Sequence, residues 1–208
     1  ETSFVNPKLT WEVMKTLNLG LDLNALNNRI QTSVNYYINN NDKSILSIPL
    51  PTQSGFNSYL DNTGKIVNRG FEFELYGVIS TQQKLGWTTS LNFATNSSEI
   101  IDIPVAYNLD QNGVYARNEE GHALNEWYMY QVDGLITQQD IDSDIPRRGD
   151  AMVGSLKYLD VNDDGEIDGE DRDWSGSPTP KYFYGMTNNF SFKNFSLSIF
   201  FHGAQGGY

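Results

Sequence analysis

The sequence predicts an all-β protein, built as an antiparallel meander of long hairpins. The first observation is that hydrophobic residues recur at every second position in several long segments, which is the spacing of a strand with one apolar face. The second is the composition of the 208 residues, because 12 Tyr, 11 Phe and 18 Gly favour strands and turns. The third is that tight turns alternate with long connections along the chain.

The first hairpin contains the clearest strand of the chain. In residues 16–23 (TLNLGLDL), leucines alternate with polar or small residues. The turn-forming segment NALNN follows, and alternation then resumes in RIQTSVNYYI. The pattern therefore predicts a hairpin over about residues 12–40.

Two further hairpins show the same pattern. The second, over about residues 65–98, alternates in FEFELY and in WTTSLNFA on either side of a short turn. The third, over about residues 180–203, alternates in YFYGMTNNFSF and in FSLSIFF around Lys193 and Asn194. These strands reach the roughly 9–11 residues that a tilted strand needs to cross a bilayer.

Two long excursions separate the hairpins, at about residues 41–64 and 99–179. Tight turns at one side and long loops at the other are typical of an outer-membrane barrel, whose external loops are the long ones. Residues 126–136 (EWYMYQVDGLI) are strand-like too, but a crossing there would put the next tight turn on the wrong side. We therefore expect them to lie within the second external excursion.

A different architecture produces the same alternation. A soluble, secreted β-sandwich turns its apolar face inward rather than toward lipid, so the pattern alone leaves barrel and sandwich open. In the sandwich alternative, the chain is a glycan-binding module stabilised by Ca²⁺.

Charge and composition exclude several classes of function. With 14 Lys and Arg against 26 Asp and Glu, the net charge is −12, which argues against a nucleic-acid partner. The absence of Cys removes disulfide scaffolds, thiolate catalysis and Cys-based metal sites, and two His are too few for a His-rich metal centre. No apolar run approaches the roughly 20 residues of a spanning helix, and no basic-then-apolar leader opens the chain.

Residues 160–171 (DVNDDGEIDGED) have the spacing of a Ca²⁺-binding loop. Gly165 takes the sharp turn, and Asp171 stands where such loops normally carry Glu. The alternative is an acidic surface turn, which Asp, Asn and Gly also favour. Because the sequence predicts no flanking helices, we expect a structural rather than a signalling ion. The predicted ligands are Asp160, Asn162, Asp164, Glu166, Asp168 and Asp171.

Acidic residues and aromatics in the second excursion suggest contact with a substrate or a partner, with an ordinary solvated loop as the alternative for the acidic residues. Residues 133–173 hold 13 acidic and 4 basic side chains, which accounts for −9 of the net charge of −12. Trp127, Tyr128 and Trp174 are weak candidates for stacking on sugar rings, the alternatives being ordinary packing or the aromatic girdle of a barrel.

We assign no catalytic residue and expect no enzyme. Glu72 and Glu74 share one strand face, as a pair of catalytic carboxylates could. Side chains on one strand face point the same way, however, and do not flank a scissile bond. A position on the water-exposed inner wall of a barrel explains them better. His122 and His202 have no sequence neighbours that suggest a triad, and no nucleophile elbow, P-loop or dinucleotide fingerprint occurs.

Four segments resemble the barrel of SusC/RagA-type TonB-dependent transporters, in the order found in that family. They are NPKLTWE at residues 6–12, VNRGFEFEL at 67–75, LKYLDVNDDGEID at 156–168 and PTPKYFYGMTNNFSFKNFSLSIFFHGAQG at 178–206. The last segment is the most specific, because an aromatic pair followed by HGAQG is rare in unrelated sequences. The resemblance extends over nearly the whole chain and is weakest at residues 99–125 and 137–150.

The resemblance implies that residues 1–208 are a fragment of a large barrel of about 22 strands, lacking the plug. It further implies active import of oligosaccharides, or secondly peptides, across the outer membrane of a Gram-negative cell. The implied partners are a SusD-like surface lipoprotein, TonB acting through the missing plug, and outer-membrane lipid. Ca²⁺ is the only cofactor that we expect.

Overall fold

The structure is a computed structural model that describes residues 6–82, 85–111 and 114–207. The chain divides into two compact units. The first comprises Glu1–Tyr107, Asn118–Leu124 and Thr179–Tyr208, and the second comprises Asn108–Arg117 and Asn125–Pro178. Among the described residues, no helix is both long and apolar enough to span a membrane.

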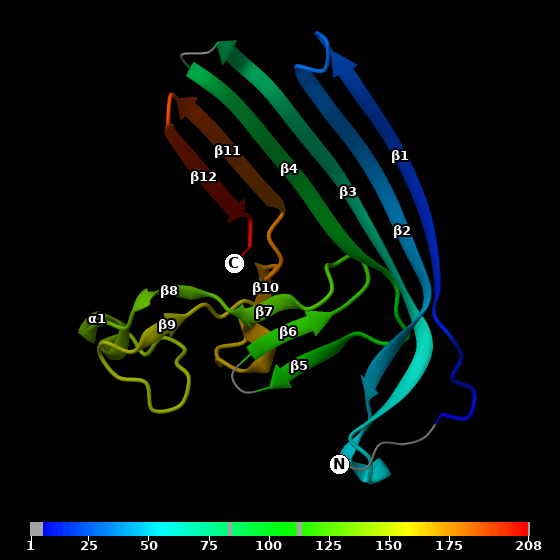
Figure 1. The fold of residues 1–208 in the computed structure, drawn as a ribbon. Helices are drawn as coiled ribbons and strands as arrows, with labels where there is room; N and C mark the ends of the chain where they lie inside the picture. Colours follow the sequence, from blue (N-terminus) through cyan, green and yellow to red (C-terminus); the bar gives the residue numbers. More distant parts are fainter. Residues whose placement is uncertain (1–5, 83–84, 112–113, 208) are drawn as a thin grey trace. The chain divides into compact units, whose positions relative to one another are not determined.

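The first unit is one six-stranded antiparallel sheet in the order β1-β2-β3-β4-β11-β12. Figure 1 shows the six strands side by side in a curved, twisted sheet. Every strand except β11 follows its neighbour directly along the chain, and β11 pairs with β4 after the long excursion. The strands are β1 (Val13–Ala25), β2 (Ile30–Pro49), β3 (Ser58–Gln82), β4 (Leu85–Asp102), β11 (Tyr182–Phe192) and β12 (Phe195–Gln205).

The strand register sorts the side chains into an apolar and a polar face. Residues paired directly across an antiparallel ladder point to the same side of the sheet, so each row of partners lies on one face. One row on the apolar face is Leu23, Thr32, Leu75, Leu91, Met186 and Phe201. The adjacent row on the polar face is Asp22, Ser33, Glu74, Asn92, Gly185 and His202.

The apolar face is exposed rather than buried. Leu19, Leu21 and Phe201 are 60%, 56% and 60% exposed. In a β-sandwich, a second sheet would cover such side chains. The sandwich alternative is therefore wrong, because its apolar face would have to be inside. An uncovered apolar face is what the wall of a membrane barrel presents to lipid.

The tight turns lie at one end of the sheet and the long connections at the other, as the alternation of turn lengths predicts. Residues 26–29 join β1 to β2, and Lys193–Asn194 join β11 to β12. Asn27 and Asn28 adopt the left-handed conformation (φ 54° and 62°), which Asn tolerates better than most residues. Because neighbouring strands are antiparallel, the β2–β3 and β4–β11 connections leave from the opposite end.

The first predicted excursion, at about residues 41–64, is mostly strand. β2 continues to Pro49 and β3 begins at Ser58, so only residues 50–57, with the 3-10 turn η1 (Thr52–Ser54), connect them. The physical reason is a bulge at Lys43, which has φ of 59° and shifts the register between Asn41 and Ser44. The extra residue turns the even-numbered positions of β2 to the opposite face, and the polar residues 39–44 around it interrupt the apolar pattern.

The buried side chains of the first unit gather on β2, β3 and β4 toward the long connections. After the bulge, Leu46 and Ile48 are 8% and 3% exposed, while Ile45 between the bulge and Leu46 is exposed. The backbone of Ile100 exchanges hydrogen bonds with Gly121 and His122, which attaches residues 118–124 to β4. The buried hydrophobic residues of this unit are Leu46, Ile48, Ile66, Val67, Ile100, Ile103 and Tyr107.

The second predicted excursion contains structure of its own. β7 and β8 cover most of the strand-like residues 126–136 and belong to two small sheets, outside the six-stranded one. A four-stranded sheet has the order β10-β7-β6-β5, and β8 pairs with β9. The elements are β5 (Tyr107–Gln111), β6 (Val114–Asn118), β7 (Glu126–Tyr130), β8 (Val132–Leu135), α1 (Gln138–Asp142), β9 (Leu156–Tyr158), η2 (Gly169–Asp171) and β10 (Arg172–Gly176).

The short helix α1 is fixed by a capping box. The Thr137 hydroxyl accepts a hydrogen bond from the Asp140 N–H, and the Asp140 carboxylate accepts one from the Thr137 N–H at 2.8 Å. Lys157 Nζ lies 3.1 Å from Asp140 and 3.7 Å from Asp133. Hydrogen bonds from Thr137, followed by Lys157, lower the pKa of Asp140 to about 2. The hydrogen bond to Asp140 in turn raises the pKa of Lys157.

Candidate functional site

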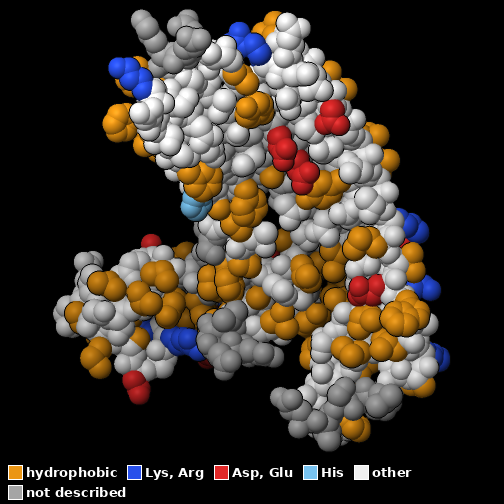
Figure 2. All heavy atoms as spheres, in the orientation of Figure 1, with side chains coloured by type: hydrophobic (Ala, Val, Ile, Leu, Met, Phe, Trp, Pro, Cys, Tyr) orange, Lys and Arg blue, Asp and Glu red, His pale blue; other side chains and the backbone are white. Residues whose placement is uncertain are grey.

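The polar face of the six-stranded sheet extends over all six of its strands. Asp22, Glu72 and Glu74 project from it. In the rows that begin at Met14 to Asn24 of β1, no described residue on this face is Lys or Arg. In Figure 2, acidic side chains gather on the face of the sheet turned toward the viewer, while Lys and Arg lie at its margins. The face is therefore wetted and mildly anionic.

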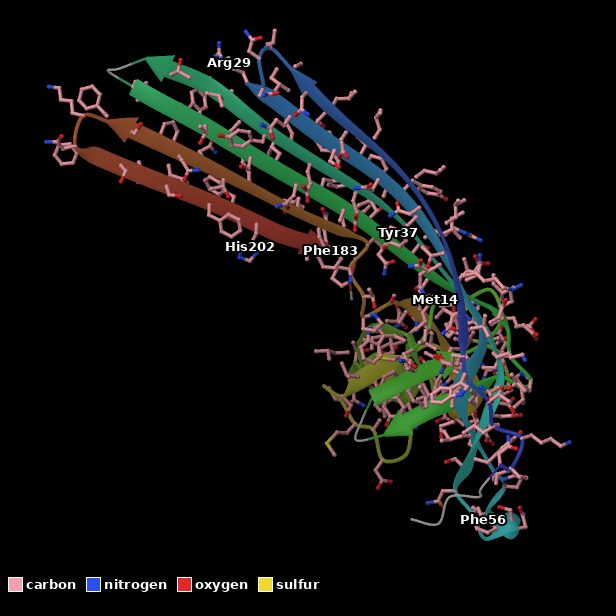
Figure 3. The ribbon with its side chains drawn as sticks, turned by 45° about the vertical axis from the view of Figure 1, so that its right-hand side comes forward. Met14, Arg29, Tyr37, Phe56, Phe183 and His202 are labelled. Carbon is pink, nitrogen blue, oxygen red and sulfur yellow. The ribbon has the colours of Figure 1, made fainter. Side chains whose placement is uncertain are left out.

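Tyr37 crosses a neighbouring strand on this face. It pairs with Gly70 on β3, and its hydroxyl reaches β4, where it donates a hydrogen bond to Asn96 Oδ1 at 3.2 Å. A Cβ at Gly70 would collide with the Tyr37 ring carbons and hydroxyl. The absence of a side chain at residue 70 thus allows the ring to lie flat against the sheet. Figure 3 labels Tyr37 on β2, together with Phe183 and His202, which the register places on the same face.

Two hollows lie along the sheet. The first, of about 590 Å³, follows the row of Asp22, Ser33, Glu74 and Asn92. The second, of about 520 Å³, surrounds Tyr37. No described residue is hydrogen-bonded to the side-chain amides of Asn18, Asn39 or Asn68 in this second hollow. Its lining residues are Met14, Thr16, Asn18, Tyr37, Asn39, Asn68, Glu72 and Asn96.

Glu72 and Glu74 are two residues apart on β3. Both are exposed, and they lie on the polar face in neighbouring rows. Among the described residues, no hydrogen bond or ion pair joins either carboxylate to another side chain, and Glu72 lines the same hollow as Tyr37. His202 stacks on Phe200, with ring centroids 5.3 Å apart, and His122 contributes its backbone carbonyl to Ile100.

The structure brings two of the three aromatic candidates together. Trp174 on β10 pairs with Tyr128 on β7, and their rings meet edge to face with centroids 5.2 Å apart. The Arg117 guanidinium lies 5.1 Å from the centre of the Tyr128 ring. Trp127, which neighbours Tyr128 along β7, points to the opposite face of this small sheet. The Tyr128 ring already contacts Trp174 and Arg117, which favours the packing alternative for this pair.

The same face holds a stack of aromatic and arginine side chains; the sequence pointed to Tyr115 and Tyr130 as loop aromatics but not to the arginines. The Arg172 guanidinium lies 4.6 Å from the Tyr115 ring centre and 5.3 Å from that of Tyr130. Arg148 lies 4.7 Å from the Tyr130 ring centre, and Tyr158 is tilted against Tyr130 at 5.3 Å. The pairing of β7 with β6 and β10 brings Tyr115, Tyr130 and Arg172 together. Tyr158 on β9 and Arg148 in a loop add to this cluster from outside that sheet.

The acidic loop at residues 160–171 has the predicted turn. Gly165 has φ of 86°, and the Asp160 carboxylate accepts hydrogen bonds from the N–H groups of Asp164 at 3.2 Å and Gly165 at 2.9 Å. The Asp171 side chain is fully buried and accepts hydrogen bonds from the N–H groups of Val161 at 2.9 Å and Asp168 at 2.7 Å.

These hydrogen bonds engage carboxylates that the sequence predicts as Ca²⁺ ligands. The carboxylates of Asp160, Asp164 and Asp171 are turned toward backbone N–H groups of the loop. Within the described ranges, no group of three or more His, Cys, Asp or Glu side chains converges as a metal site. Ca²⁺ binding by residues 160–171 stays a prediction from the sequence.

Comparison with known proteins places the chain in a family. A family described as "TonB dependent receptor-like, beta-barrel" matches residues 2–200. The chain belongs to the TonB-dependent receptor β-barrel family. This confirms the resemblance to SusC/RagA-type transporters and the partial-barrel fold.

Individual relatives agree with this membership. TonB-dependent receptor P3 of Formosa agariphila is 31% identical over 99% of this chain and 22% of its own length. TonB-dependent receptor SusC of Bacteroides thetaiotaomicron is 25% identical over 98% of this chain and 20% of its own length. A solved structure of the RagAB peptide importer in a closed-closed state superposes with a TM-score of 0.76, at 26% identity over 97% of this chain and 22% of that one. The chain thus spans about a fifth of the length of these relatives.

Proposed function

We propose that this chain forms part of the barrel wall of an outer-membrane importer that is driven by TonB. The observation that carries the proposal is the six-stranded sheet itself, with an uncovered apolar face suited to lipid and a polar face suited to a water-filled lumen. Membership in the receptor-barrel family supports the same function. The relatives are named as receptors and importers, which favours transport over catalysis.

The ends of the sheet suggest an orientation. In outer-membrane barrels the short turns face the periplasm and the long loops face outward. The turns at residues 26–29 and 193–194 would then be periplasmic, and the small sheets of the second unit would be external. In this orientation the excursion is on the side where a substrate and a SusD-like lipoprotein would meet the barrel. TonB would act from the periplasm through a plug on another part of the protein.

Oligosaccharides are the substrates that we propose first, and peptides second. Amides, a hydroxyl and an aromatic ring line the hollow around Tyr37, and these groups match the hydroxyls and the apolar ring faces of sugars. The neighbouring structure named a peptide importer favours the second choice. Measuring which of the two classes, oligosaccharides or peptides, the cells import through this protein decides between the two proposals.

An uptake experiment in cells tests this function. We expect deletion of the gene to abolish uptake of oligosaccharides too large for porins, and removal of TonB or collapse of the proton gradient to do the same. A monosaccharide that passes through porins is the control and should be taken up normally. If cells without the gene still import every oligosaccharide and peptide tested, the proposed function is wrong.

The proposed partner has its own measurement. The full-length protein, extracted from the outer membrane in mild detergent, should co-purify with a surface lipoprotein encoded in the same cell. Recovery of the full-length protein from a soluble fraction would contradict both the location and the partner.

A further inference from the structure

One aromatic ring on the polar face, that of Tyr37, both covers a glycine and lines a hollow. Tyr37 is half-buried in the hollow of about 520 Å³, where its ring lies across β3 at Gly70. We propose that Tyr37 is a stacking platform for a sugar ring of an uncharged oligosaccharide that moves along the barrel wall. This inference rests on the proposed import function and names a site and a ligand class for it.

The platform is preorganised. One side of the Tyr37 ring lies against the backbone at Gly70, and its hydroxyl is tied to Asn96 Oδ1 at 3.2 Å. Two fixed points on neighbouring strands hold the plane of the ring parallel to the wall. A ring that is ordered before binding loses little conformational entropy when a ligand stacks on it.

The groups around the ring suit sugar hydroxyls. The side-chain amides of Asn18, Asn39 and Asn68 each carry a donor and an acceptor, and these groups have no partner among the described residues. Each hydroxyl of a sugar is also both a donor and an acceptor, so the two sets are complementary. Glu72 adds a carboxylate that accepts hydrogen bonds from hydroxyl groups.

Charge narrows the ligand class. The lining of the hollow contains one carboxylate and no Lys or Arg among its described residues. A sulfated or carboxylated ligand would meet a negative charge without a compensating cation, which disfavours it. The hollow therefore fits an uncharged sugar unit better than an anionic one.

A second Tyr–Gly pair supplies a matched control. Tyr184 on β11 lies over Gly203 on β12, with its ring carbon Cζ at 2.5 Å from where a Cβ of residue 203 would be. Tyr184 is in the row of Phe93 and Phe73, on the apolar face. If aromatic cover of a glycine only stabilised the sheet, both pairs would have the same role. Only the Tyr37 pair faces the amide-lined hollow.

The test uses the full-length protein with its natural partner, reconstituted from outer membranes. Binding and uptake of a series of uncharged oligosaccharides are measured for the wild type and for Tyr37→Ala, Tyr37→Phe and Tyr184→Ala. We expect Tyr37→Ala to weaken binding roughly three- to tenfold, which is the range for loss of one aromatic partner. Tyr37→Phe keeps the ring but loses the Asn96 anchor, so a smaller loss is expected. Tyr184→Ala should bind and import as the wild type does.

Other outcomes overturn the proposal. If the wild type and Tyr37→Ala bind the oligosaccharides with equal affinity, Tyr37 is not a stacking platform. The same follows if Tyr37→Ala and Tyr184→Ala lose affinity equally. If peptides measured alongside bind more weakly to Tyr37→Ala while the oligosaccharides do not, the sugar platform is overturned. If Tyr37→Ala does not reach the outer membrane, Asn39→Ala and Asn68→Ala replace it, and unchanged affinity in both would overturn the site. TonB-dependent uptake by the wild type tests the proposed function separately, because it can persist when the platform is absent.

Discussion

Trp87 on β4 and Phe190 on β11 stack with their ring centroids 5.5 Å apart, although the whole second excursion lies between them in the chain. The Trp87 indole N–H also donates a hydrogen bond to Asn188 Oδ1 at 3.1 Å, across a separation of 101 residues. Asn188 is buried, and its row includes Ile199 on the apolar face. The indole thus satisfies a polar group on an apolar surface and fixes the register of β11 against β4.

This contact predicts a graded effect of substitution at residue 87. Trp87→Phe keeps an aromatic ring but leaves the Asn188 carbonyl unpaired, which should lower the free energy of unfolding by about 1 kcal/mol. Trp87→Ala removes the stacking as well and should cost about 2–4 kcal/mol. Denaturant midpoints of the full-length protein in detergent measure both. Equal midpoints for Trp87→Phe and the wild type would show that the indole N–H bond contributes nothing.

The two faces of β1 predict opposite responses to the same charge. Leu21 lies on the apolar face and Asp22 on the polar face, next to each other in the chain. A Lys or Arg facing lipid near the bilayer midplane costs about 2–4 kcal/mol, whereas the lumen tolerates it. We expect Leu21→Arg to reduce the amount of folded barrel in the outer membrane and Asp22→Arg to leave it unchanged. Equal amounts of the two variants would contradict the assignment of faces.

The hairpins could be predicted from the sequence because one face of each strand is apolar. With a period of two, a slip of one residue would turn every leucine of residues 16–23 to the wrong side. The extension of β2 to Pro49 was missed because residues 39–44 (NNNDKS) are a polar run without apolar alternation. Beyond the bulge, burial alternates again at Leu46 and Ile48, on the opposite face of the sheet.

The small sheets were harder to predict for a different reason. β5 to β10 are three to five residues long, too short for a period to stand out. The contact of Tyr128 with Trp174 and the stack of Arg172 between Tyr115 and Tyr130 depend on long-range pairing. The Tyr37 platform was missed as well. A glycine opposite a tyrosine becomes visible only when the register of β2 and β3 is known.

The Asp140–Lys157 pair predicts a pH dependence of the α1 region. The ordinary pKa of Asp140 is 3.8 and its folded value is about 2, so its contribution to stability is complete above 3.8 and is lost as the pH falls through about 2. The pKa of Lys157 is raised above 10.5, so its contribution is present below 10.5 and is lost only when the pH exceeds the raised value. We expect cleavage by pepsin near residues 137–157 to be slow at pH 4 and fast near pH 2.

The control for this prediction is Asp140→Asn, which removes the titrating carboxylate. Its cleavage rate at pH 4 should already be fast, with little further change near pH 2 beyond that of the protease itself. A wild-type rate that follows only the pH dependence of pepsin activity would contradict the role of Asp140.

The Ca²⁺ prediction for residues 160–171 is tested with terbium, which replaces Ca²⁺ and emits when a nearby Trp is excited. Trp174 is three residues beyond Asp171, so a bound ion should show sensitised emission that Ca²⁺ displaces. The double variant Asp160→Asn, Asp164→Asn should lose this emission, whereas Asp140→Asn, outside the loop, should keep it. Identical emission from the double variant and the wild type would exclude an ion in this loop.

The measurement that tests the central claim most directly is single-cysteine labelling along β1. The 208 residues contain no Cys, so after replacement of any Cys elsewhere in the full-length protein by Ser, each of residues 17–23 is changed to Cys in turn. A barrel wall predicts that positions 18, 20 and 22 react with a water-soluble maleimide and positions 17, 19, 21 and 23 with a lipid-partitioning one. Labelling of all seven positions by the water-soluble reagent alone would contradict a membrane-spanning wall.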